Sequence, residues 1–422
     1  MLITMRGRAM SSEPPTTVSR GLGRAVLTHV PDAVHTVQDA TVKTSNDRLS
    51  SHDNGFGLLR LIFATMVLWD HAFPLGGFGR DPMWHLTLDQ DSMGGICVSG
   101  FFAISGFLIA KSGMRADLLQ FAWRRCVRIF PAYWAVLAIT AFCVGPVIHY
   151  LDAGTLHGYW NTVVGGPLGY VVNNWNLQIG QYGINSLLRD TTPYGTSVSA
   201  SVFNGSIWTL IYEAQCYVMV GIFAVFGLLT AHRRVLLGIT VAAWMLLALQ
   251  IIDPAFPGKV VPWLGDPHAV QYGAIFLMGS CAAAYSRQLP ISDKLGVFAV
   301  GVYLVSLFKG GYFVLGYPAM VYSILWLACR LPGWARRIGA KNDYSYGIYV
   351  FGFLVQQLLA YAGIYRYGFA VFLAASVFFT FICAWLSWHL VEKRALALKD
   401  WGPGRGWQFF LAGLIVKKEE RQ

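Results

Sequence analysis

Apolar residues recur along this chain in long blocks that short polar connections separate. From Phe56 onward, each block is close to the roughly 17–25 residues that a helix needs to cross a bilayer. The longest connection, residues 151–204, is rich in Gly, Asn and Thr. The pattern predicts membrane helices over residues 56–73, 92–110, 129–150, 205–229, 235–252, 269–286, 294–308, 312–329, 345–364 and 368–390.

Composition supports lipid as the solvent of these blocks. Of the 422 residues, 55% are hydrophobic and 13% are charged, against roughly 25% charged in a typical soluble domain. A soluble fold of this length could not cover its surface with so few charges. Fifteen Trp and twenty Tyr suit a chain that meets the membrane interface many times. We therefore expect an all-α integral membrane protein of about ten transmembrane helices.

The distribution of basic residues sets the orientation of these helices. The formal net charge is +11, which in a soluble protein would raise nucleic acid as a partner. Here, with the N-terminus in the cytosol, 27 of the 32 Lys and Arg residues fall on the cytosolic side. This asymmetry follows the positive-inside rule and predicts that both termini are cytosolic. It also accounts for the basic residues without a nucleic-acid partner.

The blocks divide the chain into three parts. Residues 1–53 are polar and lack the apolar run of a signal peptide, so we expect a flexible cytosolic extension. Met5 and Met10 are alternative starts within it. Residues 54–398 form the membrane domain, and residues 399–422 form a cytosolic tail. No CxxC pair occurs among the seven cysteines, so we expect small buried side chains and neither a disulfide framework nor a metal site.

The first predicted helix carries Arg60, Asp70 and His71. Arg60 and His71 are eleven positions apart, which places both on one helix face, about 16 Å apart along the axis. A charge at the centre of the bilayer costs at least about 2.5–3.5 kcal/mol, so these side chains should face protein or water. They would then form a polar seam with His71 as a proton acceptor. Alternatively, Arg60 reaches the inner headgroups and His71 bonds a neighbouring carbonyl. Asp70 points about 100° away from His71.

A basic cluster and a buried carboxylate are the other candidates for chemistry. Arg124, Arg125 and Arg128 lie in the first predicted inner loop, just before Pro131, which would cap the next membrane helix. On a helix the three would fall within one sector, and three guanidinium groups on one face suit phosphate groups, although setting topology is the alternative role. Glu213 lies inside the fourth predicted helix at a depth similar to that of His71. There a carboxyl is paired, protonated or bonded to a neighbouring helix.

Small residues in the second predicted helix indicate close packing. Gly100 and Gly106 alternate with Ser99 and Ser105 at a spacing that allows tight helix contact. Neither serine stands in a nucleophile elbow, which argues against covalent serine catalysis.

These segments, in order from about residue 55 to 398, resemble the acyltransferase 3 family of bacterial membrane acyltransferases. The similarity consists of Arg60 and His71 eleven apart, Gly100-Phe101-Phe102-Ala103-Ile104-Ser105-Gly106-Phe107-Leu108, the Arg124, Arg125, Arg128 and Pro131 cluster, Trp208-Thr209-Leu210-Ile211-Tyr212-Glu213-Ala214-Gln215-Cys216-Tyr217, Ser345-Tyr346-Gly347-Ile348-Tyr349-Val350, and Val391-Glu392-Lys393. A histidine that the family often has after the fifth segment is replaced by Phe351-Gly352.

The resemblance implies a stand-alone O-acyltransferase of the bacterial inner membrane. It would move an acyl group, commonly acetyl from acetyl-CoA, to a hydroxyl of a carbohydrate such as lipopolysaccharide, exopolysaccharide, peptidoglycan or lipochitooligosaccharide. His71 would be the general base. Glu213 would orient or charge His71 or contact the sugar, and Asp70 is a further candidate catalytic carboxylate. Arg60, Arg124, Arg125 and Arg128 would bind the phosphates of acetyl-CoA.

Two other readings of the same residues stay open at this point. Intramembrane Arg, Asp, His and Glu could form the pathway of a proton-coupled transporter or flippase for a lipid-linked or small solute. Against that reading, no inverted repeat or pair of discontinuous helices stands out. A non-catalytic assembly subunit is the third reading. The sequence names neither the acceptor sugar, nor the length of the acyl group, nor the oligomeric state.

Overall fold

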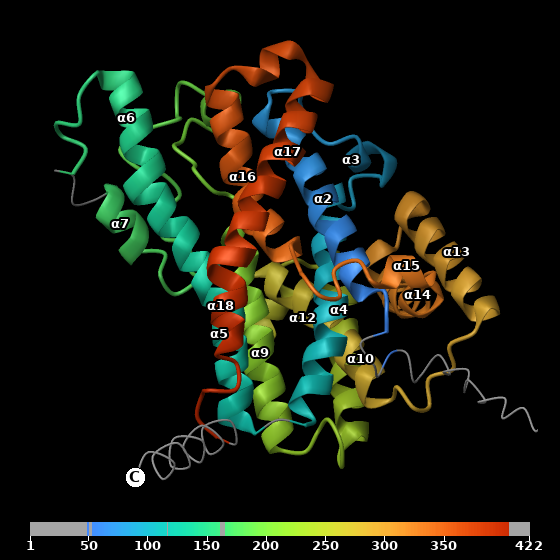
Figure 1. Ribbon diagram of the computed structural model, residues 1–422. Coiled ribbons are helices and arrows are strands. Elements are labelled where there is room, and N and C mark those ends of the chain that lie inside the picture. Colours follow the sequence, from blue (N-terminus) through green and yellow to red (C-terminus); the bar gives the residue numbers. More distant parts are fainter. Residues whose placement is uncertain (1–48, 50–52, 116, 161–164, 405–422) are drawn as a thin grey trace, which may run out of the picture. The chain divides into compact units, whose positions relative to one another are not determined.

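Helices make up the regular structure of residues 49, 53–115, 117–160 and 165–404, which a computed structural model describes (Figure 1). No strand occurs within these residues. All of them belong to one unit, residues 43–422. The expected N-terminal extension, apart from residues 49 and 53, and the tail beyond residue 404 lie outside the described residues.

Each predicted block contains a helix. The long elements are α2 (Phe56–Leu75), α4 (Met93–Gly113), α5 (Leu118–Ile139), α9 (Leu210–Val225), α10 (Arg233–Ile252), α12 (Pro267–Ala284), α13 (Asp293–Lys309), α14 (Tyr317–Arg330), α16 (Ser345–Tyr361) and α17 (Phe369–Ser387). Short elements connect or extend them: α3 (Met83–Leu86), η1 (Thr140–Val144), α6 (Gly145–Ala153), α7 (Pro167–Val172), α8 (Pro193–Val198), η2 (Ile207–Thr209), α11 (Phe256–Val260), η3 (Pro262–Leu264), η4 (Tyr312–Gly316), α15 (Gly333–Arg336), η5 (Ile364–Tyr367), η6 (Trp388–Glu392) and α18 (Lys393–Ala397).

Seven helical stretches in the described part of the chain are long and apolar enough to cross a membrane. They cover residues 56–75, 93–113, 118–153, 207–225, 233–252, 312–330 and 369–397. The remaining predicted blocks form α12, α13 and α16, with 18, 17 and 17 residues. These three do not reach the same combination of length and hydropathy. The fold is therefore helical and consistent with a membrane protein. Seven of the ten expected spans are long and apolar enough to cross a bilayer.

The third helix begins earlier than its apolar block. Asp117 caps it by accepting hydrogen bonds from the backbone amides of Leu119 and Gln120 at 3.0 and 3.3 Å. The helix then runs through Pro131, which we expected to start the membrane segment. The basic cluster therefore lies on a helix rather than in a loop, because the cap, not hydropathy, decides where the helix starts.

Helix α4 is the central element of the bundle. It lies against α2, α9 and α12, and α16 packs on the other side of α2 (Figure 1). In the apolar stretch of α4, 72% of the residues are buried inside the protein, whereas only 17% are buried in the corresponding stretch of α10. Small residues permit this, because Cβ atoms added at Gly106 and Gly279 would lie 2.1 Å from the carbonyl oxygen of Phe276 and 2.3 Å from that of Ala103. The predicted packing role of Gly106 is confirmed.

The close approach of α4 and α12 gives a first prediction. Gly279→Ala should lower the free energy of unfolding by about 1–3 kcal/mol, because its methyl group meets the backbone of α4. Gly273→Ala, on the same helix, is the control, since nothing lies within 4 Å of its Cβ position. Thermal unfolding in detergent measures both. Equal melting temperatures for the two variants would contradict the packing account.

Candidate active site

A cavity of about 200 Å³ is lined by the predicted basic residues. We call it the inner cavity because these residues are expected on the cytosolic side. Helix α2 supplies Arg60, and α5 supplies Arg124, Arg125 and Arg128. Lys399 lines the same cavity. The four arginines line one cavity because α5 carries the whole cluster and because Asp343 contacts both Arg128 and Arg60. The structure therefore brings together every residue that we expected to bind acetyl-CoA.

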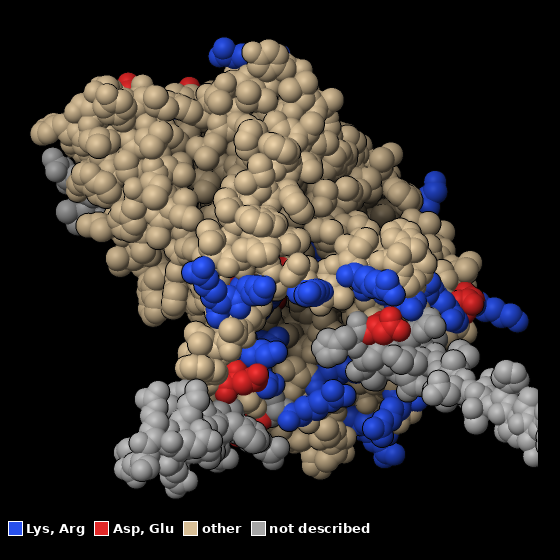
Figure 2. Space-filling model, in the orientation of Figure 1, with Lys and Arg blue, Asp and Glu red and all other residues tan. Residues whose placement is uncertain are grey.

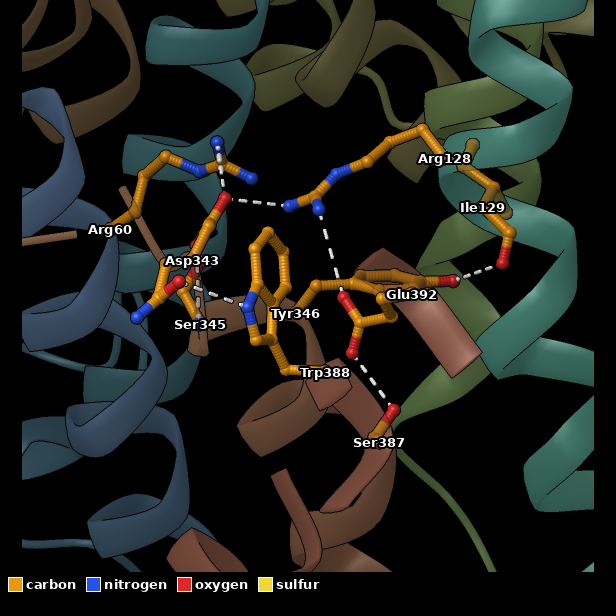
Figure 3. A network of polar contacts seen from close by, with 10 residues as sticks. Arg60, Arg128, Ile129, Asp343, Ser345, Tyr346, Ser387, Trp388 and Glu392 are labelled. Atoms are coloured by element: carbon orange, nitrogen blue, oxygen red, sulfur yellow. Dashed lines mark hydrogen bonds and ion pairs between the residues drawn. The ribbon is translucent and has the colours of Figure 1, made fainter. Parts of the chain in front are cut away.

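Three of these four arginines already have carboxylate partners. Asp343 Oδ2 lies 3.0 Å from Arg60 Nη1 and 2.6 Å from Arg128 Nη2 (Figure 3). Glu392 Oε2 lies 3.6 Å from Arg128 Nη1, and Asp400 pairs with Arg124 at 2.7 Å. The sequence did not lead us to Asp343 or Asp400, and we named Glu392 only as part of the Val391-Glu392-Lys393 motif, without a partner. Two acidic residues near the end of the chain and one just before α16 were the available signal, but nothing in the sequence pairs them with particular arginines.

Arg125 differs from the other three. Within the described residues it forms neither an ion pair nor a hydrogen bond, and its Nε atom is buried without a partner. The guanidinium lies over the rings of Phe121 and Tyr217, 5.8 Å from each centroid. Cation–π contacts offset part of the cost of burying a cation, but they leave its N–H groups unbonded. Arg125 is thus a half-buried cation that can receive an anion.

Asp343 is the centre of a polar network that joins four segments. Its Oδ1 accepts hydrogen bonds from the backbone and side chain of Ser345. Burial by itself would raise the pKa of Asp343, but the guanidinium groups of Arg60 and Arg128, with the bonds from Ser345, lower it to about 2. Ser387 Oγ also donates to Glu392 Oε1 at 2.8 Å (Figure 3). The network holds α2, α5, α16 and η6 around the inner cavity.

Glu213 lies in the inner cavity with the arginines. The hydroxyl of Tyr217, one turn further along α9, donates a hydrogen bond to its Oε1. Glu213 does not line the cavity that contains His71. The geometry therefore places this carboxylate beside the basic cluster and not beside the candidate base.

An outer cavity of about 250 Å³ contains the other two candidates. Asp70 and His71 line it, and the ring of His71 packs edge-on against Phe353 with 5.4 Å between centroids. His71 makes no hydrogen bond within the described residues, so the unprotonated nitrogen of its neutral ring is free to receive a proton. Asp70 presses on α4 where Gly94 leaves room, since a Cβ there would lie 2.6 Å from Asp70 Oδ2.

Asp91 is a lining residue of the outer cavity that sequence reasoning missed. It precedes α4, is 8% exposed, and has a buried Oδ2 without a hydrogen-bond partner. Burial raises the pKa of Asp91 to about 7, and the nearby charges of Asp70 and Asp81 contribute. Its position in the sequence, directly before a membrane helix and on the same side as His71, could have indicated that Asp91 lies near the candidate base.

The two cavities meet at a common wall. Val98, Thr209 and Tyr349 line both of them. Arg60 therefore faces the inner cavity and His71 the outer one, from the same helix. The expected polar seam exists as two chambers with side chains between them. Among the described residues, no group of three or more His, Cys, Asp or Glu side chains could hold a metal ion.

Comparison with known proteins gives the class of this architecture. Residues 53–389 match the family model of the acyltransferase domain, Acyl_transf_3. The chain therefore belongs to this family, as its motifs indicated, and is a membrane-associated acyltransferase. No solved structure matches it.

Named relatives share most of the chain. It is 28% identical over 356 residues to the O-acetyl transferase of Shigella phage Sf6, covering 81% of this chain and 96% of the phage protein. It is 28% identical over 382 residues to Nodulation protein 10 of Rhizobium leguminosarum bv. viciae, covering 84% and 96%. A Bacillus subtilis (strain 168) protein provisionally named peptidoglycan O-acetyltransferase YrhL is 25% identical, covering 74% of this chain and 52% of that protein.

The Asp343 network gives a second prediction. Asp343→Asn should reduce the free energy of unfolding at pH 7 by about 3 kcal/mol, because two guanidinium groups lose their shared carboxylate. Since folding lowers the pKa of Asp343 from 3.8 to about 2, its contribution is complete above about pH 4 and is lost as the pH falls toward 2. The difference in melting temperature between wild type and variant should narrow over that interval.

Asp253→Asn is the control for this prediction. Asp253 pairs with Lys259 at 2.6 Å, but its side chain is 43% exposed, so its loss should change the melting temperature little. Melting curves between pH 2 and pH 7 that coincide for wild type and Asp343→Asn would show that the network is not stabilising.

Proposed function

We propose that the protein is a membrane-bound O-acetyltransferase that moves the acetyl group of acetyl-CoA to a hydroxyl of a cell-surface or exported carbohydrate. One observation carries the proposal. A cavity lined by four arginines and a cavity lined by His71 meet at one wall, in a chain of the acyltransferase family. The first cavity suits a polyanionic donor, and the second offers a base to an acceptor.

The proposal includes an orientation in the bacterial inner membrane. Ten helices cross the bilayer, both ends are cytosolic, and residues 1–53 and 399–422 extend from a membrane domain at 54–398. Lys and Arg side chains gather toward one end of the face in Figure 2, and Arg60 and Lys399 border the inner cavity. This gathering supports a cytosolic inner cavity, because basic residues stay on that side. The outer cavity then faces the compartment where surface glycans are exposed.

On the donor side, the size of the inner cavity limits what enters it. About 200 Å³ is below the roughly 300–1,000 Å³ of sites that enclose a whole small ligand. The narrow thioester-bearing arm of acetyl-CoA would occupy the cavity, and the nucleotide would remain at the cytosolic mouth. Arg125 would bind a phosphate group first, because it has no carboxylate to release. Arg60, Arg124 and Arg128 would reach the donor only by sharing or leaving their carboxylates.

On the acceptor side, His71 is the general base. It takes the proton of the acceptor hydroxyl while the hydroxyl oxygen attacks the thioester carbonyl carbon. The carbon–oxygen bond forms, the carbon–sulfur bond breaks, and the sulfur leaves with the CoA arm. The proton on His71 then passes to that sulfur, which restores the base. Asp70 and Asp91 lie in the same cavity, where carboxylates stabilise the imidazolium that forms.

The lining of the outer cavity supports a carbohydrate acceptor. Trp208 and Tyr272 supply aromatic faces, and Gln271 and His268 supply hydrogen-bonding groups. Sugar rings present apolar faces and hydroxyl edges, so they suit a site of this mixed kind. The name of the Bacillus subtilis relative refers to a peptidoglycan substrate, which is in keeping with a glycan acceptor here.

Replacing the base gives a third prediction. His71→Ala should reduce transfer of label from acetyl-CoA to the host's surface glycan by about 10²–10⁴-fold, the usual contribution of a general base. His232→Ala, at the start of α10 and outside both cavities, controls for expression and insertion. Full activity of an inserted His71→Ala protein would eliminate the mechanism. A wild-type protein that leaves acetyl-CoA intact would favour the transporter alternative.

The basic cluster gives a fourth prediction. Arg125→Ala should raise the KM for acetyl-CoA by about 10–100-fold with a smaller change in kcat, because a charge-assisted contact to phosphate is worth about 1.5–3 kcal/mol. Arg125→Lys should recover part of the loss, since it keeps the charge but not the bidentate geometry. Arg234→Ala, outside the inner cavity, is the matched control. A lower protein yield with an unchanged KM would indicate that the arginines set the membrane topology and do not bind acetyl-CoA.

A further inference from the structure

The wall between the two cavities consists of side chains from three elements. Val98 comes from the first third of α4, Thr209 from the end of η2, and Tyr349 from α16. We call these three residues the collar. Only the collar belongs to the lining of both cavities. In the proposed reaction, a group shared between the arginines and His71 would meet these side chains.

Hydrogen bonds hold the collar in place. The hydroxyl of Tyr349 donates to the carbonyl oxygen of Ser206 at 2.6 Å and also bonds the hydroxyl of Thr209. In return, Ser206 Oγ lies within hydrogen-bond distance of the carbonyl oxygen of Tyr349, at 3.1 Å. Asn204 Nδ2 donates to the carbonyl oxygen of Val350 at 2.8 Å. The segment before α9 is thus bonded to α16 at several points, and the collar is fixed.

The third collar residue is as constrained as the other two. Val98 is 8% exposed, on the most deeply buried of the membrane helices. Its neighbour Ser99 bonds the hydroxyl of Tyr317 at 2.9 Å, which fixes the rotation of α4 at this level. The position of the Val98 Cα atom is fixed because α4 packs against α2, α9 and α12, and a packed interior resists displacement.

The position of the collar constrains the acyl group. In the proposed function, the thioester carbonyl must be accessible to a hydroxyl activated by His71 while the CoA arm remains in the inner cavity. The carbonyl then lies at the collar, and the alkyl end of the acyl group lies against Val98, Thr209 and Tyr349. Beyond the collar, the carboxylates of Asp70 and Asp91 line the outer cavity together with aromatic faces such as that of Trp208, so the collar itself would supply the selectivity for the acyl group.

We propose that the collar of Val98, Thr209 and Tyr349 is the specificity-determining element that restricts the donor to a two-carbon acyl group. The inference rests on the proposed function and deepens it by naming the residues that restrict the donor to acetyl. One extra methylene in a closely packed apolar site typically changes selectivity by about 10–200-fold. A fixed collar supplies such packing, whereas a mobile wall would accept longer chains by yielding.

The experiment compares acetyl-, propionyl- and butyryl-CoA as labelled donors. Membrane vesicles from host cells that carry the full-length protein supply the host's own glycans as acceptors, and label in the carbohydrate fraction gives kcat/KM for each donor. Wild type should prefer acetyl over butyryl. Val98→Ala, which removes two methyl groups from the collar, should raise the butyryl-to-acetyl ratio by about tenfold or more.

A second variant and two controls make the result specific to the collar. Thr209→Ser removes one methyl group but keeps the hydroxyl that bonds Tyr349, so it should raise the propionyl-to-acetyl ratio without loosening the wall. Leu108→Ala, which lines only the inner cavity, and Val67→Ala, which lines only the outer one, should change the rates with all donors alike.

The possible outcomes distinguish a failure of the collar proposal from a failure of the proposed function. Transfer of butyryl as efficient as transfer of acetyl in wild type would overturn the collar proposal and leave the acyltransferase function intact. Ratios in Val98→Ala or Thr209→Ser that match wild type, in protein of normal yield, would do the same. A wild-type protein that transfers no acyl group from any of the three donors would overturn the proposed function, and the collar with it.

Discussion

The carboxylate of Asp343, held between Arg60 and Arg128, is the interaction on which the site depends. It joins the first membrane helix to α5 at the start of α16, and Glu392 extends the connection to the last helix. Removing one partner of such a buried group leaves an uncompensated charge, so the segments that carry these residues must stay together. The same contacts restrain two of the four arginines of the inner cavity. The guanidinium groups of Arg60 and Arg128 would therefore have to serve both the structure and the binding of the donor. Arg125 has no carboxylate partner among the described residues, so it is available for binding alone.

Lipid imposes the second constraint on this arrangement. Charged side chains in an apolar solvent are stable only when they face protein or a wet cavity. In this chain they converge into two chambers instead of scattering over the bundle. The close contact of Gly106 and Gly279 with facing backbone makes this possible, because it brings α4 and α12 near enough to close the site from one side. Tight packing in the centre thus accompanies the polar cavities around it.

Two chambers separated by a fixed wall suit a reaction whose substrates come from opposite sides of a membrane. A continuous water-filled channel would expose the thioester to hydrolysis and the membrane to leakage. In the proposed reaction, the side chains that line both chambers would let one small group be shared while the bulk of donor and acceptor stay apart. Family membership establishes the class of enzyme, and the division of the polar residues between the chambers suggests how such an enzyme separates its substrates.

The sequence alone was enough to predict the helical blocks, the membrane character and the family, and to propose the arginines and His71 as site residues, because hydropathy and short motifs are local properties of the chain. It placed the start of α5 too late, since a cap at Asp117 outweighs hydropathy there. It could not supply Asp343, Glu392 or Asp91 as partners, or separate Glu213 from His71. Those relations join residues more than a hundred positions apart in several cases, and only the packing of α2, α5, α9 and α16 decides which side chains share a cavity.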